Sequence, residues 1–221
     1  MLMIILTAAC IVLAGAFILQ EKQENYVPAV ILKGAASLCF VLLGALNAPK
    51  GNPAAAKIVI GLLLGMIADV LLNLRFVVKN GKPVFLVGIL VFLAGHIMYL
   101  LAVFPMVRSK WIVLIAAAVL TALLMKWIFS KITAEKAFKI FGIVYIGAIV
   151  LLNCSAISNL ITAPGAFTAV FAIGAVLFLV SDIVLILNTF GPKSEFRLRV
   201  TNLSLYYAGQ LLIAFSLSLL G

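Results

Sequence analysis

Residues 55–74 read AAKIVIGLLLGMIADVLLNL, and within this stretch only Lys57, Asp69 and Asn73 carry polar side chains. A helix needs about 20 mostly apolar residues to cross the hydrocarbon core of a bilayer. A charged side chain at the centre of such a helix costs at least about 2.5–3.5 kcal/mol, so it usually has a function. The stretch therefore predicts a transmembrane helix with a functional aspartate.

Comparable apolar runs fill almost the whole chain, separated by short breaks rich in Gly, Pro and Asn. The first run lacks a basic leader and a convincing cleavage site, so we interpret it as a helix rather than a signal peptide. The pattern predicts an all-α, polytopic membrane protein of about eight transmembrane helices, forming a single membrane-embedded domain over residues 1–221. The runs span residues 2–19, 27–46, 55–74, 83–104, 111–129, 136–155, 166–188 and 202–220.

The composition excludes a water-soluble protein. Hydrophobic residues make up 66% of the chain and charged residues only 10%, whereas a soluble domain carries about 25% charged residues. The net charge of +10 comes from Lys and Arg between the apolar runs, where they meet lipid headgroups, so nucleic-acid binding is not expected. Cys10, Cys39 and Cys154 lie inside apolar runs and are read as small buried residues.

The distribution of basic residues predicts the orientation of the chain. The odd-numbered loops hold more Lys and Arg than the even-numbered loops, and the positive-inside rule places such loops in the cytoplasm. We therefore expect a multi-pass protein of a bacterial cell membrane with both termini outside. The odd-numbered loops hold Lys22, Arg75, Lys79, Lys82, Lys131, Lys136, Lys193, Arg197 and Arg199, and the opposite side holds Lys50, Lys57, Arg108 and Lys110.

Two pairs of short motifs suggest an internal repeat. Gly61-Leu-Leu-Leu-Gly-Met-Ile-Ala-Asp69 aligns with Gly174-Ala-Val-Leu-Phe-Leu-Val-Ser-Asp182. One run later, Ala94-Gly95-His96 aligns with Ala208-Gly209-Gln210. The runs that contain the two aspartates are expected to cross in the same direction, so the motifs suggest a parallel pseudo-repeat of four plus four helices.

Asp69 and Asp182 are the acidic residues within the expected membrane spans, because Glu21, Glu24, Glu135 and Glu195 fall in expected loops. Each aspartate precedes the expected cytoplasmic end of its run by five or six residues, roughly 8 Å. A common depth on two helices predicts one shared site. We expect further polar residues in the same pocket, which would be floored by His96 and open to the cytoplasmic leaflet: Lys33, Ser37, Asn73, His96, Tyr99, Asn188, Tyr206, Tyr207 and Gln210.

Each of these residues also has a structural interpretation. Lys33 could extend its amine to the interface, and Tyr206 and Tyr207 could belong to an aromatic belt. Asn73 and Asn188 could finish helix ends, and His96 could be a hydrogen-bonded packing residue. The basic residues at the helix ends could hold a lipid phosphate or only set the topology.

The motifs of several enzyme classes are missing from the sequence. It has no GxSxG elbow, no phosphate-binding loop and no HExxH, and its single His is insufficient for a three-histidine zinc site. What remains for Asp69 and Asp182 is acid–base catalysis or proton-coupled transport, with no metal or other cofactor required.

Four segments of the apolar runs combine these polar residues with a fixed apolar context: Gly65-Met-Ile-Ala-Asp-Val-Leu-Leu72, Phe92-Leu-Ala-Gly-His-Ile-Met-Tyr99, Phe178-Leu-Val-Ser-Asp-Ile-Val-Leu185 and Tyr206-Tyr-Ala-Gly-Gln210. Together they resemble the YhhN-like family, which includes the animal lysoplasmalogenases, and the likeness covers nearly the whole chain in order. One position differs, since Ala68 stands where many relatives have Gly.

The resemblance implies hydrolysis of the vinyl ether bond of lysoplasmalogens, with Asp69 and Asp182 as the paired catalytic aspartates. The substrate would be a lysophospholipid within the bilayer. Such a reaction needs one carboxylic acid to protonate the alkene and one carboxylate, helped by Lys33, to stabilise the cation and activate water. A small proton-coupled transporter using the same aspartates is the main alternative, and a non-catalytic lipid-binding protein is a third.

Overall fold

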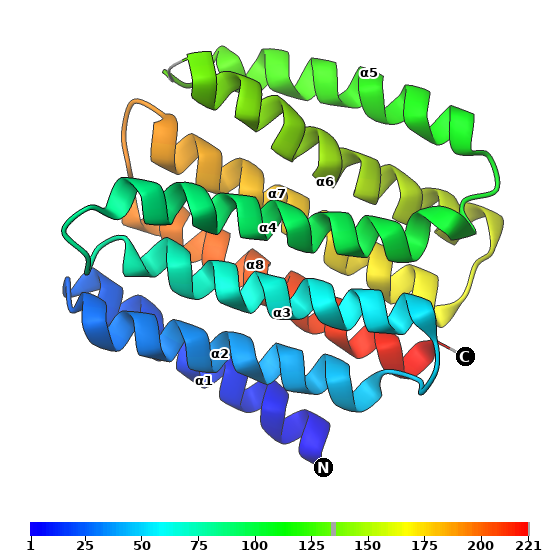
Figure 1. The fold of residues 1–221 in the computed structure, drawn as a ribbon, viewed down its shortest axis with the longest axis horizontal. Helices are drawn as coiled ribbons and strands as arrows, with labels where there is room; N and C mark the ends of the chain where they lie inside the picture. The colour runs from blue at the N-terminus through cyan, green and yellow to red at the C-terminus, as the bar shows by residue number, and fades with distance from the viewer. Residues whose placement is uncertain (134–135, 221) are drawn as a thin grey trace. The chain divides into compact units, whose positions relative to one another are not determined.

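The computed structural model describes residues 1–133 and 136–220, so Glu135 lies outside the described residues. Eight helices in the described part are long and apolar enough to cross a membrane, which confirms the all-α, multi-pass architecture (Figure 1). They are α1 (Leu2–Lys22), α2 (Tyr26–Asn47), α3 (Pro53–Leu74), α4 (Gly81–Val103), α5 (Lys110–Phe129), α6 (Lys136–Thr162), α7 (Ala166–Phe190) and α8 (Phe196–Ser216), with short 3-10 turns η1 (Phe104–Met106) and η2 (Leu217–Leu219).

Local chemistry fixes where α3 begins. Oδ1 of Asn52 accepts hydrogen bonds from the backbone N–H groups of Ala54 and Ala55, at 2.9 and 3.2 Å. Pro53 occupies the first helical position, where its missing N–H costs nothing. The sequence therefore carries the start signal of the helix that bears Asp69.

The helix α6 extends to Thr162, beyond the expected end at residue 155. Its polar side chains are compatible with a helix because they bond to carbonyls one turn earlier. Asn153 donates to Ile149 at 2.9 Å, and Ser155 donates to Leu151 at 2.7 Å. These polar residues lowered the apolar signal without ending the helix.

The helix α8 begins at Phe196, six residues before the expected start at residue 202. Arg197 and Arg199, expected in a loop, lie in its first turns, where Thr201 donates to the Arg197 carbonyl at 3.0 Å. Tyr206 consequently lies about three turns into the helix rather than at its start. The expected boundary was wrong because a polar first turn does not read as a transmembrane segment.

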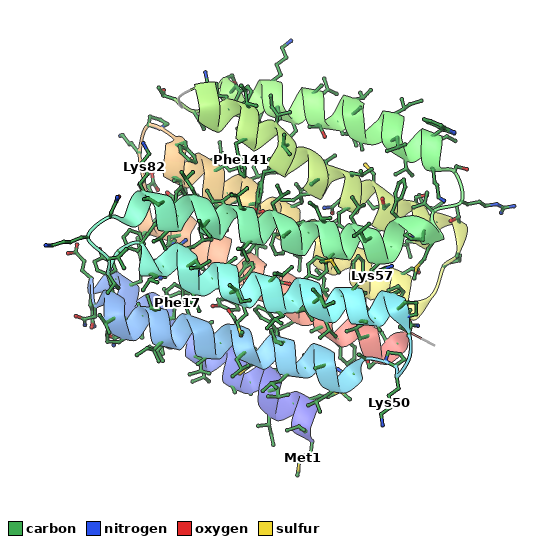
Figure 2. The ribbon with its side chains drawn as sticks, viewed as in Figure 1. Met1, Phe17, Lys50, Lys57, Lys82 and Phe141 are labelled. Carbon is green, nitrogen blue, oxygen red and sulfur yellow. The ribbon has the colours of Figure 1, made fainter. Side chains whose placement is uncertain are left out.

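The chain divides into two compact units, whose boundaries fall inside α4 and α8 rather than in linkers. Unit 1 comprises Met1–Tyr99 and Ile213–Gly221. In it α1 packs on α2 and α2 packs on α3, with consecutive helices antiparallel (Figure 1). Met1, Lys50 and Lys57 lie towards one end of these helices and Lys82 lies at the opposite end (Figure 2).

Unit 2 comprises Leu100–Leu212, in which α5 packs on α6 and α6 packs on α7. A side-chain hydrogen bond joins α6 to the last residue of α4, since Asn159 donates to the Val103 carbonyl at 2.9 Å. The turn η1 also packs against α6. Unit 2 thus positions α7, the helix that carries Asp182.

Each unit contains one close helix crossing at a pair of glycines. In unit 1 a Cβ added at Gly95 of α4 would lie 3.1 Å from the Gly61 carbonyl oxygen of α3. In unit 2 a Cβ added at Gly209 of α8 would lie 2.9 Å from the Gly174 carbonyl oxygen of α7. These are the glycines that the motif alignment pairs, so the aligned motifs form the same contact within each unit. The parallel relation of the two halves stays a prediction.

Candidate active site

The first cluster of buried polar residues lies between α2 and α3 in unit 1. Lys33 and Ser37 are one turn apart on α2, and Asp69 and Asn73 are one turn apart on α3. Nζ of Lys33 lies 3.2 Å from Oδ1 of Asp69, and the Ser37 hydroxyl donates to Oδ2 of Asp69 at 2.6 Å. Spacing of i and i+4 on each helix aligns the four side chains on facing surfaces. We call these four residues the Asp69 cluster.

Lys33 does not extend to the interface. Its side chain is 4% exposed and its amine lies 5.4 Å from the centroid of the Phe17 ring of α1, which covers it. The snorkelling interpretation was therefore wrong. Burying a lysine is costly unless it is paired, and here the Asp69 carboxylate and the Asn73 amide oxygen supply the partners.

Asn73 has a second hydrogen-bonding group within the same cluster. Its Oδ1 accepts from Nζ of Lys33 at 3.1 Å. Its Nδ2 is buried and has no hydrogen-bond partner among the described residues. Because a buried donor left unsatisfied costs free energy, this amide is a candidate to bind an oxygen of a ligand.

His96 and Tyr99 lie one turn apart on α4. Nδ1 of His96 is 2.8 Å from the Phe92 carbonyl oxygen, so this nitrogen donates and Nε2 faces away from that bond. The Tyr99 ring meets the His96 ring edge-on, with centroids 6.3 Å apart, and packs directly over Gly61. Both side chains are buried, so His96 is a hydrogen-bonded residue of the unit 1 core.

The second carboxylate, Asp182, lies on α7 in unit 2. Its Oδ2 accepts a hydrogen bond of 2.7 Å from the Tyr145 hydroxyl of α6, and Asp182 is only 2% exposed. Eight residues separate it from Phe190 at the helix end, about 12 Å, because α7 extends beyond the expected end. The expected distance of five or six residues was therefore too short for Asp182, although it holds for Asp69, five residues before Leu74.

Sequence reasoning missed Tyr145, Ser181 and Asn202. The Ser181 hydroxyl donates to the Asn202 carbonyl at 3.0 Å, and Asn202 returns a hydrogen bond of 2.9 Å from Nδ2 to the Ser181 carbonyl. This reciprocal pair ties α8 to α7 directly beside Asp182. The available signal was that Ser181 adjoins Asp182 and that Tyr145 carries a hydroxyl inside an apolar run.

Tyr206, Tyr207 and Gln210 form a buried group on α8. Nε2 of Gln210 lies 3.4 Å from the Tyr206 hydroxyl, which confirms that these two residues share a face. The Tyr206 and Tyr207 rings are 5.1 Å apart, and Phe178 of α7 meets Tyr206 edge-on at 5.4 Å. Each tyrosine is 4% exposed, so the aromatic-belt interpretation was wrong and the rings belong to the core of unit 2.

Asn188 lies near the end of α7 and accepts a hydrogen bond of 2.7 Å on Oδ1 from the backbone N–H of Glu195. This bond fixes the turn between α7 and α8 and agrees with the helix-end interpretation of Asn188. The expected pocket residues thus fall into groups within each unit. The sharing of one site by Asp69 and Asp182 stays a prediction.

The two carboxylates have matching local environments. In each unit the aspartate accepts a hydrogen bond on Oδ2 from a hydroxyl of the preceding helix, Ser37 for Asp69 and Tyr145 for Asp182. A hydroxyl donor fixes the orientation of a carboxyl group, and at Asp69 the ion pair between Lys33 and Oδ1 adds a second constraint. Acid–base catalysis and proton transfer both use carboxyl groups that are held in a fixed orientation.

Comparison with known proteins gives one family. The model of the YhhN family matches residues 28–217, which include every residue of the Asp69 cluster as well as Tyr145 and Asp182. No curated protein and no solved structure matches the chain.

Proposed function

Because the chain belongs to the YhhN family, we propose that it is a membrane hydrolase that cleaves the vinyl ether bond of lysoplasmalogens. The products would be a fatty aldehyde and glycerophosphoethanolamine or glycerophosphocholine. The observation that carries the proposal is the presence of two buried transmembrane carboxyl groups, Asp69 and Asp182, each oriented by a hydroxyl donor. Intramembrane carboxylates are expensive and usually functional.

The reaction needs two opposite protonation states. A proton is first added to the alkene carbon that is not bonded to oxygen, which leaves an oxocarbenium ion at the carbon that bears the ether oxygen. Water then adds to this cation, and the resulting hemiacetal collapses to aldehyde and alcohol. One carboxyl group must therefore enter as an acid and the other must stabilise the cation and accept a proton from water.

The ion pair with Lys33 favours assigning the ionised role to Asp69. A cation at 3.2 Å stabilises the carboxylate form, and the Ser37 hydroxyl adds a second favourable contact. We therefore assign Asp69 as the base and electrostatic stabiliser, and Asp182, held by Tyr145, as the general acid.

We assign Asn73 and several basic residues to substrate contact. The buried Nδ2 of Asn73 suits an oxygen at the polar end of the lipid. Basic residues near the helix ends would hold the phosphate: Lys79 and Lys82 follow α3, and Arg197 and Arg199 begin α8. Arg75 is better explained by packing, since its guanidinium lies 4.5 and 4.3 Å from the ring centroids of Phe76 and Phe85. Reversing the charge at Lys79 and Lys82 should change the headgroup preference, and an unaltered preference would contradict their role.

The test is aldehyde release from lysoplasmenylethanolamine by the purified protein in detergent. We expect activity in the wild type and in the control Glu195→Gln, which removes a carboxylate from a loop. The activity of Asp69→Asn and of Asp182→Asn should fall by more than about 100-fold, since general acid–base groups contribute about 10²–10⁴-fold. In D2O, the aldehyde should carry one deuterium on the carbon next to the carbonyl.

A folded wild-type protein that releases no aldehyde would reject the proposal. Proton flux in liposomes that depends on both aspartates would then support the transporter alternative. Full activity in either Asp→Asn variant would instead retain the hydrolase and reject the catalytic role of that residue.

We also propose that both termini face outwards, as the distribution of basic residues suggests. Single cysteines introduced at Lys50 and Lys79, in a background without the native cysteines, provide the measurement. A membrane-impermeant maleimide should label Lys50→Cys on intact cells and Lys79→Cys only after permeabilisation. The reverse pattern would invert the topology.

A further inference from the structure

A groove of about 620 Å³ runs between α5 and α6 in unit 2. Its volume lies within the range of small-molecule sites, and its surface is almost entirely apolar. It is separate from the Asp182 site, because Tyr145 of α6 bonds to Asp182 whereas the neighbouring Val144 lines the groove. The lining includes Ala118, Thr121, Ala122, Val144, Gly147 and Leu151.

Small side chains explain why the groove exists. Thr121 lies beside Gly147, with its Cγ2 3.6 Å from the position of an added Cβ, and Met125 lies beside Gly142 in the same way at 3.7 Å. The side chains of Thr121 and Met125 on α5 thus contact α6 at its glycines. Ala118 and Ala122 are exposed on α5 and too short to fill the space above it. The result is a long apolar channel that follows the helix direction.

One end of the channel is cationic. Lys126 lines the groove itself, and Nζ of Lys139 lies 5.7 Å from the centroid of the Phe129 ring, which also lines it. The sequences of α5 and α6 contain no Asp or Glu. An apolar channel with two lysines at one end matches a molecule that has a long hydrocarbon tail and an anionic head.

We propose that the α5–α6 groove binds one anionic phospholipid, with an acyl chain along the channel and the phosphate between Lys126 and Lys139. Basic pockets between transmembrane helices are recognised sites for anionic headgroups. A second copy of this chain would bring the same positive charge to the same face, so the charge favours a lipid over a self-association surface.

The test is native mass spectrometry of the protein in detergent, titrated with dioleoyl phosphatidylglycerol. Removing one lysine near a lipid phosphate should weaken binding about fivefold. The double variant Lys126→Gln/Lys139→Gln should therefore bind the lipid roughly 25-fold more weakly than the wild type. Lys50→Gln/Lys110→Gln removes equal charge elsewhere and should bind normally. Ala118→Leu/Ala122→Leu fills the channel with its lysines intact and should also lose the lipid, whereas Ala8→Leu on the exposed face of α1 should not.

Phosphatidylcholine should bind more weakly than phosphatidylglycerol, and inorganic phosphate alone should not compete at equal concentration. Equal lipid binding by the Lys126/Lys139 variant and its charge-matched control would overturn the proposal. Competition by free phosphate would replace the lipid with a simple anion site. A third outcome would also overturn the proposal. If Ala118→Leu/Ala122→Leu abolished a dimer of the protein but left lipid binding unchanged, this face would be a protein interface. Circular dichroism and monodispersity establish that every variant is folded.

Discussion

The hydroxyl of Tyr145 on α6 lies 2.7 Å from Oδ2 of Asp182 on α7, and both side chains are buried. The Ser37 hydroxyl on α2 has the same relation to Asp69 on α3, at 2.6 Å. The two pairs have the same arrangement, in which one helix carries the carboxyl group and a hydroxyl of the preceding helix fixes its orientation. The difference is that Lys33 adds a formal positive charge beside Asp69.

Replacement of Tyr145 by Phe should lower kcat by up to about tenfold, because a hydrogen bond to a neutral group such as the protonated Asp182 is worth roughly 0.5–1.5 kcal/mol. KM should change little, since the buried aromatic ring at this position remains. Aldehyde release at several substrate concentrations measures the two constants. Tyr26→Phe is the matched control, because the Tyr26 ring stacks on Phe76 at the end of α3. Equal kcat values in the two variants would remove Tyr145 from the reaction.

The helices could be predicted from sequence because each must supply about 20 apolar residues, a constraint with few alternatives. The prediction was wrong where polar residues lie within a helix. Asn153 and Ser155 bond to their own helix, and Arg197 and Arg199 begin one. Hydropathy measures transfer into lipid and does not register such internal bonds.

The composition of the site was partly predictable for a related reason. A polar residue within an apolar run is easily recognised, so Lys33, Asp69 and Asn73 were identified from the sequence as candidate site residues. Their pairing depends on the rotation of α2 against α3, which the sequence does not specify. Tyr145 was missed because tyrosine in an apolar run is usually a packing residue, and only the contact with Asp182 reveals its role.

Replacement of Gly209 by Ala should destabilise the protein by about 1–3 kcal/mol, the usual cost of overpacking. The added Cβ would lie 2.9 Å from the Gly174 carbonyl oxygen and 3.2 Å from the Phe178 nitrogen, both of them backbone atoms that cannot rotate away. Gly15→Ala is the matched control, because nothing lies within 4 Å of its added Cβ. The control should be neutral or slightly stabilising. Unfolding in SDS followed by circular dichroism measures both, and similar values for the two variants would contradict the tight α7–α8 crossing.

Replacement of Asn188 by Ala should lower the unfolding free energy by about 1 kcal/mol, because the backbone N–H of Glu195 loses its acceptor. Asn188→Asp keeps an oxygen at the same place and should retain most of the stability. The midpoint of thermal unfolding in detergent separates the two variants. A loss in Asn188→Asp as large as that in Asn188→Ala would mean that the hydrogen bond to Glu195 is not the stabilising contact.

Replacement of Lys33 by Met should destabilise the protein by about 3–5 kcal/mol, since Asp69 would be left as a buried charge without its cation. Asp69→Asn removes that charge, so the double variant Lys33→Met/Asp69→Asn should be more stable than Lys33→Met alone. The double-mutant cycle isolates the coupling between the two residues. Lys50→Met, at an exposed lysine between α2 and α3, controls for the loss of one positive charge and should have little effect. Strictly additive effects of Lys33→Met and Asp69→Asn would contradict the ion pair, and with it the assignment of Asp69 as the ionised member of the catalytic pair.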